Sequence, residues 1–252
     1  MRSTLITLLT DFGTADGYVA EMKGVLYSGA PGADVVDLSH EVPPQSVDAG
    51  RLAVARYWRR FPPGTVHLVV VDPGVGSARA AMAVASDGRF LVGPDNGVLS
   101  PALLHPSARA VVVPVPPGAA PTFHGRDVFA PAAAALARGA ALASLGLPLA
   151  SPVIRRTPEP VREADGSIRG QVIAVDRFGN AVTNIVGHHE GTVLIADHTV
   201  PVRRTYADVD AGGVVALIGS SGLLEIAVRD GDAAARLGLQ RGTSVRFRPG
   251  GP

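Results

Sequence analysis

The chain has 252 residues, of which 46% are hydrophobic and 18% are charged, proportions that exclude a disordered or fibrous protein. Its 23 basic and 22 acidic residues leave a formal charge of +1, so no strong field would collect nucleic acid or anionic lipid. We therefore expect neither a nucleic-acid partner nor a membrane partner.

The chain contains no cysteine, which excludes disulfides, thiolate metal sites and a cysteine nucleophile and fits a reducing compartment. Residues 1–9 lack the charged start and long apolar core of a secretory signal, and they read as a strand that ends at Thr10. No apolar run approaches the roughly 20 residues that a membrane span needs. The sequence therefore predicts a soluble, cytoplasmic protein.

The first 150 residues alternate between strand and helix patterns. Apolar runs and helical spacings predict, in order, strand 5–10, helix 16–28, strand 33–38, helix 46–59 and strand 66–71. Shorter strands are expected at 80–85, 90–92 and 110–114, followed by an alanine-rich helix over 127–138. This alternation predicts an α/β domain over 1–150 with a Rossmann-like parallel sheet that helices cover on both faces.

The second part of the chain has a different pattern. Residues 151–169 are rich in proline, arginine, glutamate and glycine, with little apolar periodicity, which is typical of a linker. Short, turn-bounded, β-branched segments then predict a smaller all-β domain over 170–252, a sandwich or a barrel. Residues 248–252 have the composition of a disordered tail.

Polar clusters follow four of the strands predicted in the first domain. They begin at Thr10, at Ser39, at Asp72 and at Gly93, and the run from Val70 to Ser77 passes from apolar residues to a carboxylate and a tight turn. Each cluster alone is more often a cap or a turn. Because the carboxyl ends of parallel strands share one edge of a sheet, the set favours a polar pocket there.

A fifth cluster, residues 122–127, places His124, Arg126 and Asp127 at the start of a helix, where Asp127 could cap the N-terminus. We also consider whether the histidines bind a metal ion. No two of His40, His124, His188 and His189 have the i, i+4 helical spacing of zinc ligands, and no calcium loop is present, so we expect no metal.

The turn after the first strand, Asp11-Phe12-Gly13-Thr14, lacks both the G-x-G-x-x-G fingerprint and a P-loop lysine. No backbone cradle for a diphosphate is therefore predicted. An acidic residue at the end of the first strand can still accept hydrogen bonds from a ribose diol. These features favour a nucleoside ligand without phosphates, such as an adenosyl compound.

Two turns in the second domain could contribute binding groups. In the segment from Asp176 to Asn184, Phe178 could stack on a purine, Asn180 could bind its polar edge and Asp176 could pair with an ammonium group. A structural β-turn with Asn180 in a left-handed conformation explains this segment almost as well. The turn Gly219-Ser220-Ser221-Gly222 offers hydroxyl and N–H groups to a carboxylate, and a simple hairpin is an equal alternative.

At these residues the chain resembles the S-adenosyl-L-methionine (SAM) hydrolases, also called SAM hydroxide adenosyltransferases, which share a fold with the fluorinating and chlorinating SAM enzymes. The resemblance runs from Leu8 to about Gly242. It rests on eight motifs in order, which are Leu9-Thr10-Asp11-Phe12-Gly13, Glu21-Met22-Lys23-Gly24, Val36-Asp37-Leu38-Ser39-His40-Glu41-Val42-Pro43-Pro44, Val70-Val71-Asp72-Pro73-Gly74-Val75-Gly76, Gly93-Pro94-Asp95-Asn96-Gly97, Thr122-Phe123-His124-Gly125-Arg126-Asp127, Asp176-Arg177-Phe178-Gly179-Asn180 and Gly219-Ser220-Ser221-Gly222.

The resemblance implies an N-terminal α/β domain, a C-terminal β-barrel and a homotrimer with active sites between subunits. It places the catalytic triad of the hydrolases on Asp72, Arg79 and His124. It implies no cofactor, since SAM is the substrate and adenosine and L-methionine are the products. The substrate-binding residues that it implies are Asp11 for the ribose, Phe178 and Asn180 for the adenine, Asp176 with Ser220 for the methionine end, and also Gly125 and Ser221.

The halogenating relatives have a tyrosine where Asp72 stands, and the fluorinating ones have a serine where Gly125 stands. Because a carboxylate would repel a halide, these two residues favour water as the nucleophile at the ribose C5′ atom. The fluorinating enzymes also differ at Gln45 and Ser221, where they have tryptophan and arginine. Two alternatives to hydrolysis stay open, namely SAM-dependent halogenation and a SAM- or adenosine-binding protein without turnover.

Overall fold

The computed structural model describes residues 4–187 and 190–250, and it divides the chain into two compact units, Met1–Arg156 and Thr157–Pro252. The division falls inside the segment 151–169 that the sequence predicts as a linker. His188 and His189, which the sequence analysis considers as ligands, lie outside the described residues. No helix in the described part of the chain has the length and apolarity that crossing a membrane requires.

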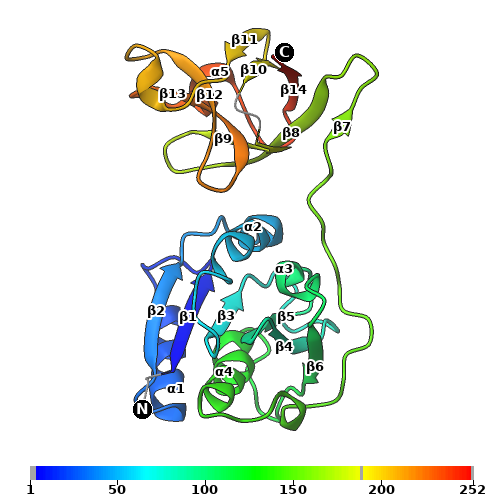
Figure 1. The fold of residues 1–252 in the computed structure, drawn as a ribbon. Helices are drawn as coiled ribbons and strands as arrows, with labels where there is room; N and C mark the ends of the chain where they lie inside the picture. Colours follow the sequence, from blue (N-terminus) through cyan, green and yellow to red (C-terminus); the bar gives the residue numbers. More distant parts are fainter. Residues whose placement is uncertain (1–3, 188–189, 251–252) are drawn as a thin grey trace. The chain divides into compact units, whose positions relative to one another are not determined.

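The first unit is built on a six-stranded sheet. Its strands are β1 (Leu5–Thr10), β2 (Asp34–Ser39), β3 (Val66–Val70), β4 (Ala81–Ser86), β5 (Arg89–Pro94) and β6 (Arg109–Val113). Its helices are α1 (Tyr18–Gly29), α2 (Val47–Tyr57), α3 (Ser100–Leu103) and α4 (Ala130–Ala137), with the π-helical turn η1 (Gly125–Phe129) before α4 and the 3-10 turn η2 (Leu142–Ser144) after it. Figure 1 shows the sheet with helices on both of its faces.

The strand order is β2-β1-β3-β5-β4-β6. The first four strands are mutually parallel, as the sequence predicts, but β4 pairs antiparallel with both β5 and β6. The prediction of a parallel sheet is therefore corrected at β4, which runs antiparallel to its two neighbours. The cause is the two-residue turn Asp87-Gly88, in which both residues have positive φ (48° and 72°), the geometry that joins adjacent antiparallel strands.

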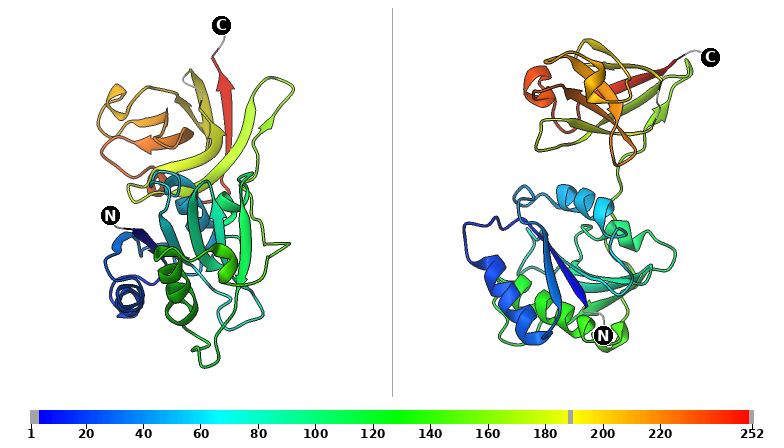
Figure 2. Two further views of the ribbon diagram at one scale, coloured as in Figure 1. Left: turned by 60° about the horizontal axis from the view of Figure 1, so that its bottom comes forward. Right: turned by 60° about the vertical axis from the view of Figure 1, so that its left-hand side comes forward.

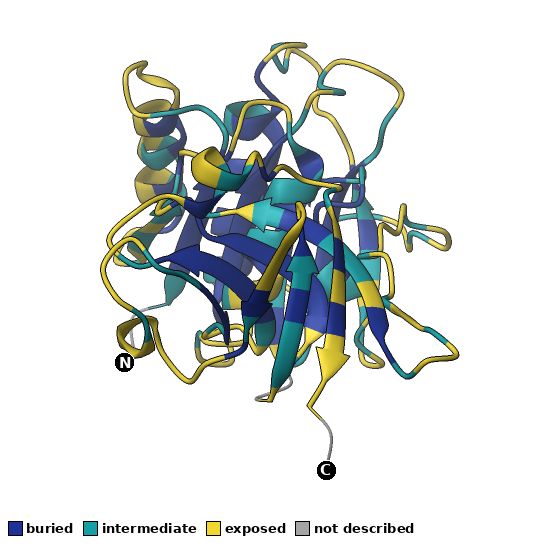
Figure 3. Ribbon diagram, turned by 90° about the horizontal axis from the view of Figure 1, so that it is seen from above, coloured by how far each residue is buried: buried dark blue, intermediate teal, exposed yellow. Residues whose placement is uncertain are grey.

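Successive residues of the central strands point to opposite faces, and each face packs against its own helices. One face, which includes Leu68 and Val70, packs in one core with Met22 and Leu26 of α1 and with residues of α4. The other face, which includes Val69, packs with residues of α2 and α3. Helices α1 and α4 lie side by side on their face (Figure 2), and the strands between the helix layers are largely buried (Figure 3).

The second unit is an antiparallel sheet that nearly closes on itself. Its path is β11-β10-β14-β8-β9-β13-β12, and a bridge between Val202 and Ala216 links the two ends of that path. Its strands are β7 (Val161–Arg162), β8 (Ile168–Val175), β9 (Ala181–Val186), β10 (Gly191–Ile195), β11 (His198–Pro201), β12 (Val214–Ile218), β13 (Leu223–Val228) and β14 (Ser244–Pro249), with the 3-10 turn η3 (Tyr206–Asp208) and helix α5 (Ala233–Leu237).

Two local expectations are wrong in this structure. Arg248 and Pro249 belong to β14 and pair with Thr192 and Gly191, so the disordered tail predicted from residue 248 does not begin there. The carboxylate of Asp127 does not cap a helix, because it accepts a hydrogen bond from the Ala120 N–H group at 2.8 Å and binds the guanidinium of Arg126. Arg248 and Pro249 pair with a strand that is distant in sequence, and Asp127 binds the Ala120 backbone and the Arg126 side chain instead of a helix end. Local sequence patterns do not reveal these partners.

Candidate functional site

The parallel strands β2, β1, β3 and β5 bring their carboxyl ends to one edge of the first sheet, where the predicted polar clusters lie. Asp11 follows β1 and Asp72 lies just beyond β3. His40 follows β2 and is only 5% exposed. Asp95 follows β5 and accepts a hydrogen bond from the Val153 N–H group at 2.7 Å, so it fixes a loop.

Asp72, Arg79 and His124 form one hydrogen-bonded group. Arg79 binds the Asp72 carboxylate through two atoms: its Nε donates to Oδ1 at 2.9 Å and its Nη2 donates to Oδ2. The same Nη2 lies 2.9 Å from His124 Nδ1. The side chains of Arg79 and Asp72 are only 9% and 5% exposed, so this ion pair lies largely out of water.

The loop between Asp72 and Arg79 has the conformation that makes this contact. Two turns fold it back, with Val75 N donating to Asp72 O at 3.2 Å and Ser77 N to Gly74 O at 3.1 Å. Gly76 has a φ of 75°, and a Cβ there would lie 2.7 Å from Pro121 O. A glycine is therefore needed for this loop to approach the segment that carries His124.

Arg79 is held so that part of its guanidinium has no partner. Its Cζ atom lies 5.2 Å from the centre of the Phe129 ring, a favourable cation–π distance. Its Nη1 atom is buried and has no hydrogen bond among the described residues. A buried N–H donor without a partner is costly, so this atom is suited to donate to a bound oxygen.

His124 is 6% exposed and accepts from Arg79 at Nδ1 when its own proton is on Nε2. Burial and the Arg79 guanidinium lower the pKa of His124, and the carboxylates of Asp72 and Asp127 only partly oppose them. If Nδ1 were protonated, its N–H group would face the N–H group of Arg79 Nη2, and neither could accept. The arrangement therefore favours a neutral His124 that orients Arg79.

Asp11 lies in the loop between β1 and α1, and its Oδ2 accepts a hydrogen bond from Gln45 N at 2.7 Å. Gln45 has a φ of 64°, a left-handed conformation that is uncommon for a residue other than glycine. Such local strain often accompanies functional sites. The sequence analysis identifies Asp11 but does not predict the conformation of Gln45.

Aromatic rings connect the Asp11 loop with the His124 segment. Phe12 and Phe123 have ring centres 6.0 Å apart, and Tyr18 lies 5.8 Å from Phe12 and 5.3 Å from Phe123. The sequence analysis quotes Phe12 and Phe123 within motifs but gives them no role. Their positions next to Asp11 and His124 are the signal that could have linked the two segments.

Gly125 lies in a tight space next to His124. A Cβ atom at this position would lie 3.1 Å from Met22 Sδ, 3.4 Å from Phe123 and 3.5 Å from Val70. The first of these distances is shorter than ordinary van der Waals contact, so a larger side chain would require Met22 to move.

In the second unit, Asp176, Phe178 and Asn180 share the turn between β8 and β9. Asp176 Oδ1 accepts from Phe178 N and Asn180 N, each at 2.9 Å, and Asp176 Oδ2 accepts from Asn180 Nδ2 at 3.1 Å. The left-handed residue is Gly179 (φ 78°), which corrects the expectation for Asn180. The turn thus holds itself together and leaves Phe178 74% exposed.

Ser220 and Ser221 are exposed on the turn between β12 and β13. The strand pairing places this turn near Val186 and places the turn of Asp176 near Ala181, which are opposite ends of β9. The structure therefore does not bring these two predicted binding turns side by side along the strand. The sequence analysis also missed Glu225, which is 7% exposed and accepts from Tyr206 Oη at 2.6 Å.

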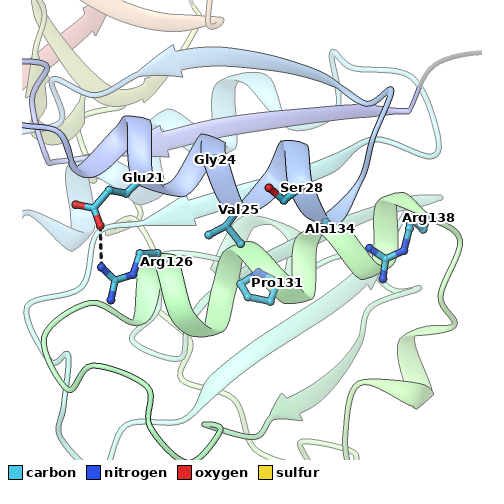
Figure 4. Close-up of a pocket in the computed structure, with 9 residues that line it drawn as sticks. Glu21, Gly24, Val25, Ser28, Arg126, Pro131, Ala134 and Arg138 are labelled. Carbon is cyan, nitrogen blue, oxygen red and sulfur yellow. Dashed lines mark hydrogen bonds and ion pairs between the residues drawn. The ribbon is translucent and has the colours of Figure 1, made fainter.

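A groove of about 600 Å³ lies between α1 and α4 (Figure 4), and none of the predicted site residues lines it. Glu21 and Arg126 face each other across it at 2.7 Å. Among residues 4–187 and 190–250, no three histidine, aspartate or glutamate side chains gather as a metal site would require. The predicted catalytic side chains that the structure brings into contact are those of Asp72, Arg79 and His124.

Comparison with known proteins adds independent findings. Residues 6–146 match the SAM hydroxide adenosyltransferase N-terminal domain, and residues 170–246 match the SAM hydroxide adenosyltransferase C-terminal domain. A protein of Thermus thermophilus named (R)-S-adenosyl-L-methionine hydrolase is 46% identical, over 96% of this chain and 98% of the relative. A protein of the same name from Salinispora arenicola is 40% identical, over 97% and 98% of the two chains.

The crystal structure of an uncharacterized conserved protein from Thermotoga maritima is also similar. It has a TM-score of 0.88 and 34% identity, and the match covers 96% of this chain and 99% of the other. A fluorinase of Actinopolyspora mzabensis is a more distant relative, 29% identical over 96% of each chain.

Proposed function

Because this chain belongs to the SAM hydroxide adenosyltransferase family, we propose that it hydrolyses S-adenosyl-L-methionine to adenosine and L-methionine. Both domain families match, in order and over most of the chain. The printed names of the relatives specify the (R) sulfonium epimer, and we extend the proposal to that epimer.

The buried Asp72–Arg79–His124 group is the observation that carries the proposed mechanism. A water molecule attacks the ribose C5′ atom in line with the C5′–S bond. The bonding electrons pass to sulfur, methionine leaves as a neutral thioether and the water loses a proton. As the water gives up its proton, its oxygen gains the negative charge of a hydroxide, and the transition state cancels this charge against the positive sulfonium. A site of low dielectric therefore favours this reaction.

Each member of the group has a distinct role in the proposal. Arg79 donates from Nη1, the buried atom without a partner, to the attacking oxygen. Asp72 orients the water and accepts its proton through a carboxylate lone pair that Arg79 leaves open. His124 fixes the orientation of Arg79 rather than taking the proton at Nδ1, because that atom already accepts from Arg79.

Halogenation is disfavoured by the same geometry. In the proposed site, the Asp72 carboxylate lies beside the attacking oxygen, where it would repel chloride or fluoride. Gly125 has no hydroxyl group to offer a halide, and its surroundings leave little space for one. Binding without turnover would not require a buried ion pair with a free donor.

The binding roles follow the expectations from the sequence. Asp11 holds the ribose hydroxyls, and Phe178 and Asn180 hold the adenine. Asp176 and Ser220 are the proposed contacts of the methionine end, and because their turns adjoin opposite ends of β9 they would contact it from separate positions. Gly125 and Ser221 are proposed as further binding residues. The exposed ring of Phe178 supports a stacking role. A homotrimer, a cytoplasmic location and a reaction without a cofactor complete the proposal, and light scattering tests the trimer directly.

The decisive experiment incubates the purified protein with each SAM epimer in chloride buffer made with H₂¹⁸O, and analyses the nucleoside by mass spectrometry. Adenosine with ¹⁸O at the 5′ oxygen is the expected product. Chlorinated nucleoside would assign the chain to halogenation instead. If SAM stays intact and its binding is measurable, the chain is a SAM-binding protein without turnover.

A further inference from the structure

Asp11 is connected to the rest of the sheet by a closed circuit of contacts that the reaction itself does not use. His40 Nδ1 lies 2.8 Å from Thr10 Oγ1, and its Nε2 lies 3.1 Å from Asp37 Oδ1. Lys23 on α1 donates to Asp37 Oδ2 at 2.6 Å. Since α1 follows the loop that carries Asp11, these contacts run from the end of β1 through β2 and back to α1.

The inner part of this circuit is buried and directional. Thr10 is 0% exposed and His40 is 5% exposed, so their polar atoms depend on each other. When the His40 proton is on Nε2, which lies close to Asp37 but without hydrogen-bond geometry, Nδ1 accepts from the Thr10 hydroxyl. Thr10 Oγ1 in turn accepts from the N–H group of Phe12 at 3.3 Å, which fixes the backbone on the far side of Asp11.

Backbone contacts join the same two loops. Gly13 N donates to His40 O at 2.8 Å, and Val42 N donates to Thr10 O at 3.4 Å. Gln45, in its left-handed conformation, donates to Asp11 Oδ2. The loop after β2 therefore holds the Asp11 loop at the backbone, at the Thr10 side chain and at the carboxylate itself.

We propose that the Thr10–His40–Asp37 circuit positions Asp11 so that its free carboxylate oxygen faces the ribose diol of an adenosyl ligand. This inference rests on the proposed function, because it takes Asp11 as the ribose-binding residue. His40 is accordingly a positioning residue and does not touch the ligand. Its removal should weaken recognition of the diol specifically.

The chain offers a matched control. Thr7, also in β1 and 0% exposed, has its Oγ1 2.7 Å from Nδ1 of the buried His67. This second threonine–histidine pair has the same chemistry but lies three residues earlier in the strand, away from Asp11. A loss that is merely structural should appear equally at both pairs.

The test measures dissociation constants of adenosine and 2′,3′-dideoxyadenosine by calorimetry for the wild type, Thr10→Val, Thr7→Val, His40→Ala and Asp11→Asn. Thr10→Val and His40→Ala should weaken adenosine about tenfold and leave dideoxyadenosine nearly unchanged. Thr7→Val should leave the ratio of the two dissociation constants, adenosine to dideoxyadenosine, unchanged. His40→Asn, whose amide oxygen can take the place of Nδ1, should restore part of the loss.

Equal weakening of both nucleosides by Thr10→Val, or an unchanged preference for the diol, would overturn the positioning role. If Asp11→Asn keeps the preference, the premise that Asp11 binds the ribose fails and the inference fails with it. That result is separate from the proposed hydrolysis, which the ¹⁸O experiment tests. A double Asp11→Asn, His40→Ala variant should lose no more preference than Asp11→Asn alone.

Discussion

The two units hold their predicted site residues in different ways. In the first unit, the largely buried Asp72 and His124 side chains both bind Arg79, so the guanidinium joins the three residues into one group. In the second unit, the turn residues bind their own turn, and Phe178 extends into solvent. Under the proposed function, the buried group of the first unit would supply fixed electrostatics for chemistry, whereas the exposed turn of the second unit would supply surface for recognition.

The largest expected effect comes from neutralising the buried carboxylate. Asp72→Asn should lower kcat by about 10²–10⁴-fold while the affinity for SAM changes little, because the lost group acts on the water. Steady-state kinetics and calorimetric binding separate the two quantities. The matched control is Asp127→Asn, which breaks the more exposed pair with Arg126 and should retain most of the turnover.

Asp72→Asn also leaves Arg79 without its charge partner, which can destabilise the fold. Arg79→Lys provides a second variant, because it keeps the charge but loses the two-atom contact. A folded Asp72→Asn enzyme with unchanged kcat would contradict the mechanism. Equal loss in Asp72→Asn and Asp127→Asn would contradict the contrast between buried and exposed pairs.

The first unit should also be sensitive to acid through His67, which is not a site residue. Burial, together with the nearby Arg89 charge, lowers the pKa of His67 to about 4. Because the unfolded value is higher, the unfolded state binds more protons, and about 3 kcal/mol of stability should be lost as the pH falls from about 6.5 to 4.

Urea titrations at pH 7 and pH 4 measure this loss, and the fluorescence of the single tryptophan, Trp58, reports on the first unit. The acid loss should be smaller in His67→Gln than in the wild type. His198→Gln, at an exposed position in the second unit, should leave the loss unchanged. An identical pH dependence in wild type and His67→Gln would show that His67 does not contribute.

A smaller effect is expected for Phe178 in the second unit. Phe178→Ala should raise KM about tenfold with little change in kcat, because stacking of a base on an aromatic ring contributes about 1–3 kcal/mol. Val186→Ala, at a position that is 67% exposed in the same unit, is the control. A fall in kcat with an unchanged KM would place Phe178 with the catalytic group and remove the contrast.

The smallest effects should come from one helix cap in each unit. Ser46 accepts from Ala49 N at the start of α2, and Asp232 accepts from Ala235 N at the start of α5. Replacing either by alanine should cost about 1 kcal/mol of stability, measured by calorimetric unfolding. Only Asp232→Ala should also raise KM, since the Asp232 carboxylate packs against Gly179 of the Phe178 turn.

The sequence predicts the strands and helices of the first unit well, because their apolar periods are regular. The antiparallel pairing of β4 with β5 was not predicted, although Asp87-Gly88 is a known hairpin signal. The strand predicted after this turn has only three residues, 90–92, whereas β5 has six, and the alternating pattern before the turn favoured a parallel arrangement. In the second unit, turn-bounded β-branched segments predict an all-β domain, but they do not reveal the near closure through Val202 and Ala216.

The sequence suggests candidate site residues but does not predict the contacts between them. Asp11 and Asp72 follow strands, so their common edge is predictable from topology. The link between Asp72 and Arg79 depends on a loop whose turns have no periodic signal. The left-handed Gln45 and the Thr10–His40 contact depend on two loops meeting in space, which a single sequence does not encode locally.

The crowding at Gly125 has a consequence for redesign of the nucleophile. Gly125→Ser, which introduces the residue that the resemblance implies for the fluorinating relatives, would place a Cβ atom 3.1 Å from Met22 Sδ, so the Met22 side chain would have to shift to admit it. The room for Gly125→Ser therefore comes from the Met22 side chain, by a shift or by its shortening. Redesign of the nucleophile at residues 72 and 125 is thus coupled to the packing of helix α1, in the layer behind those residues.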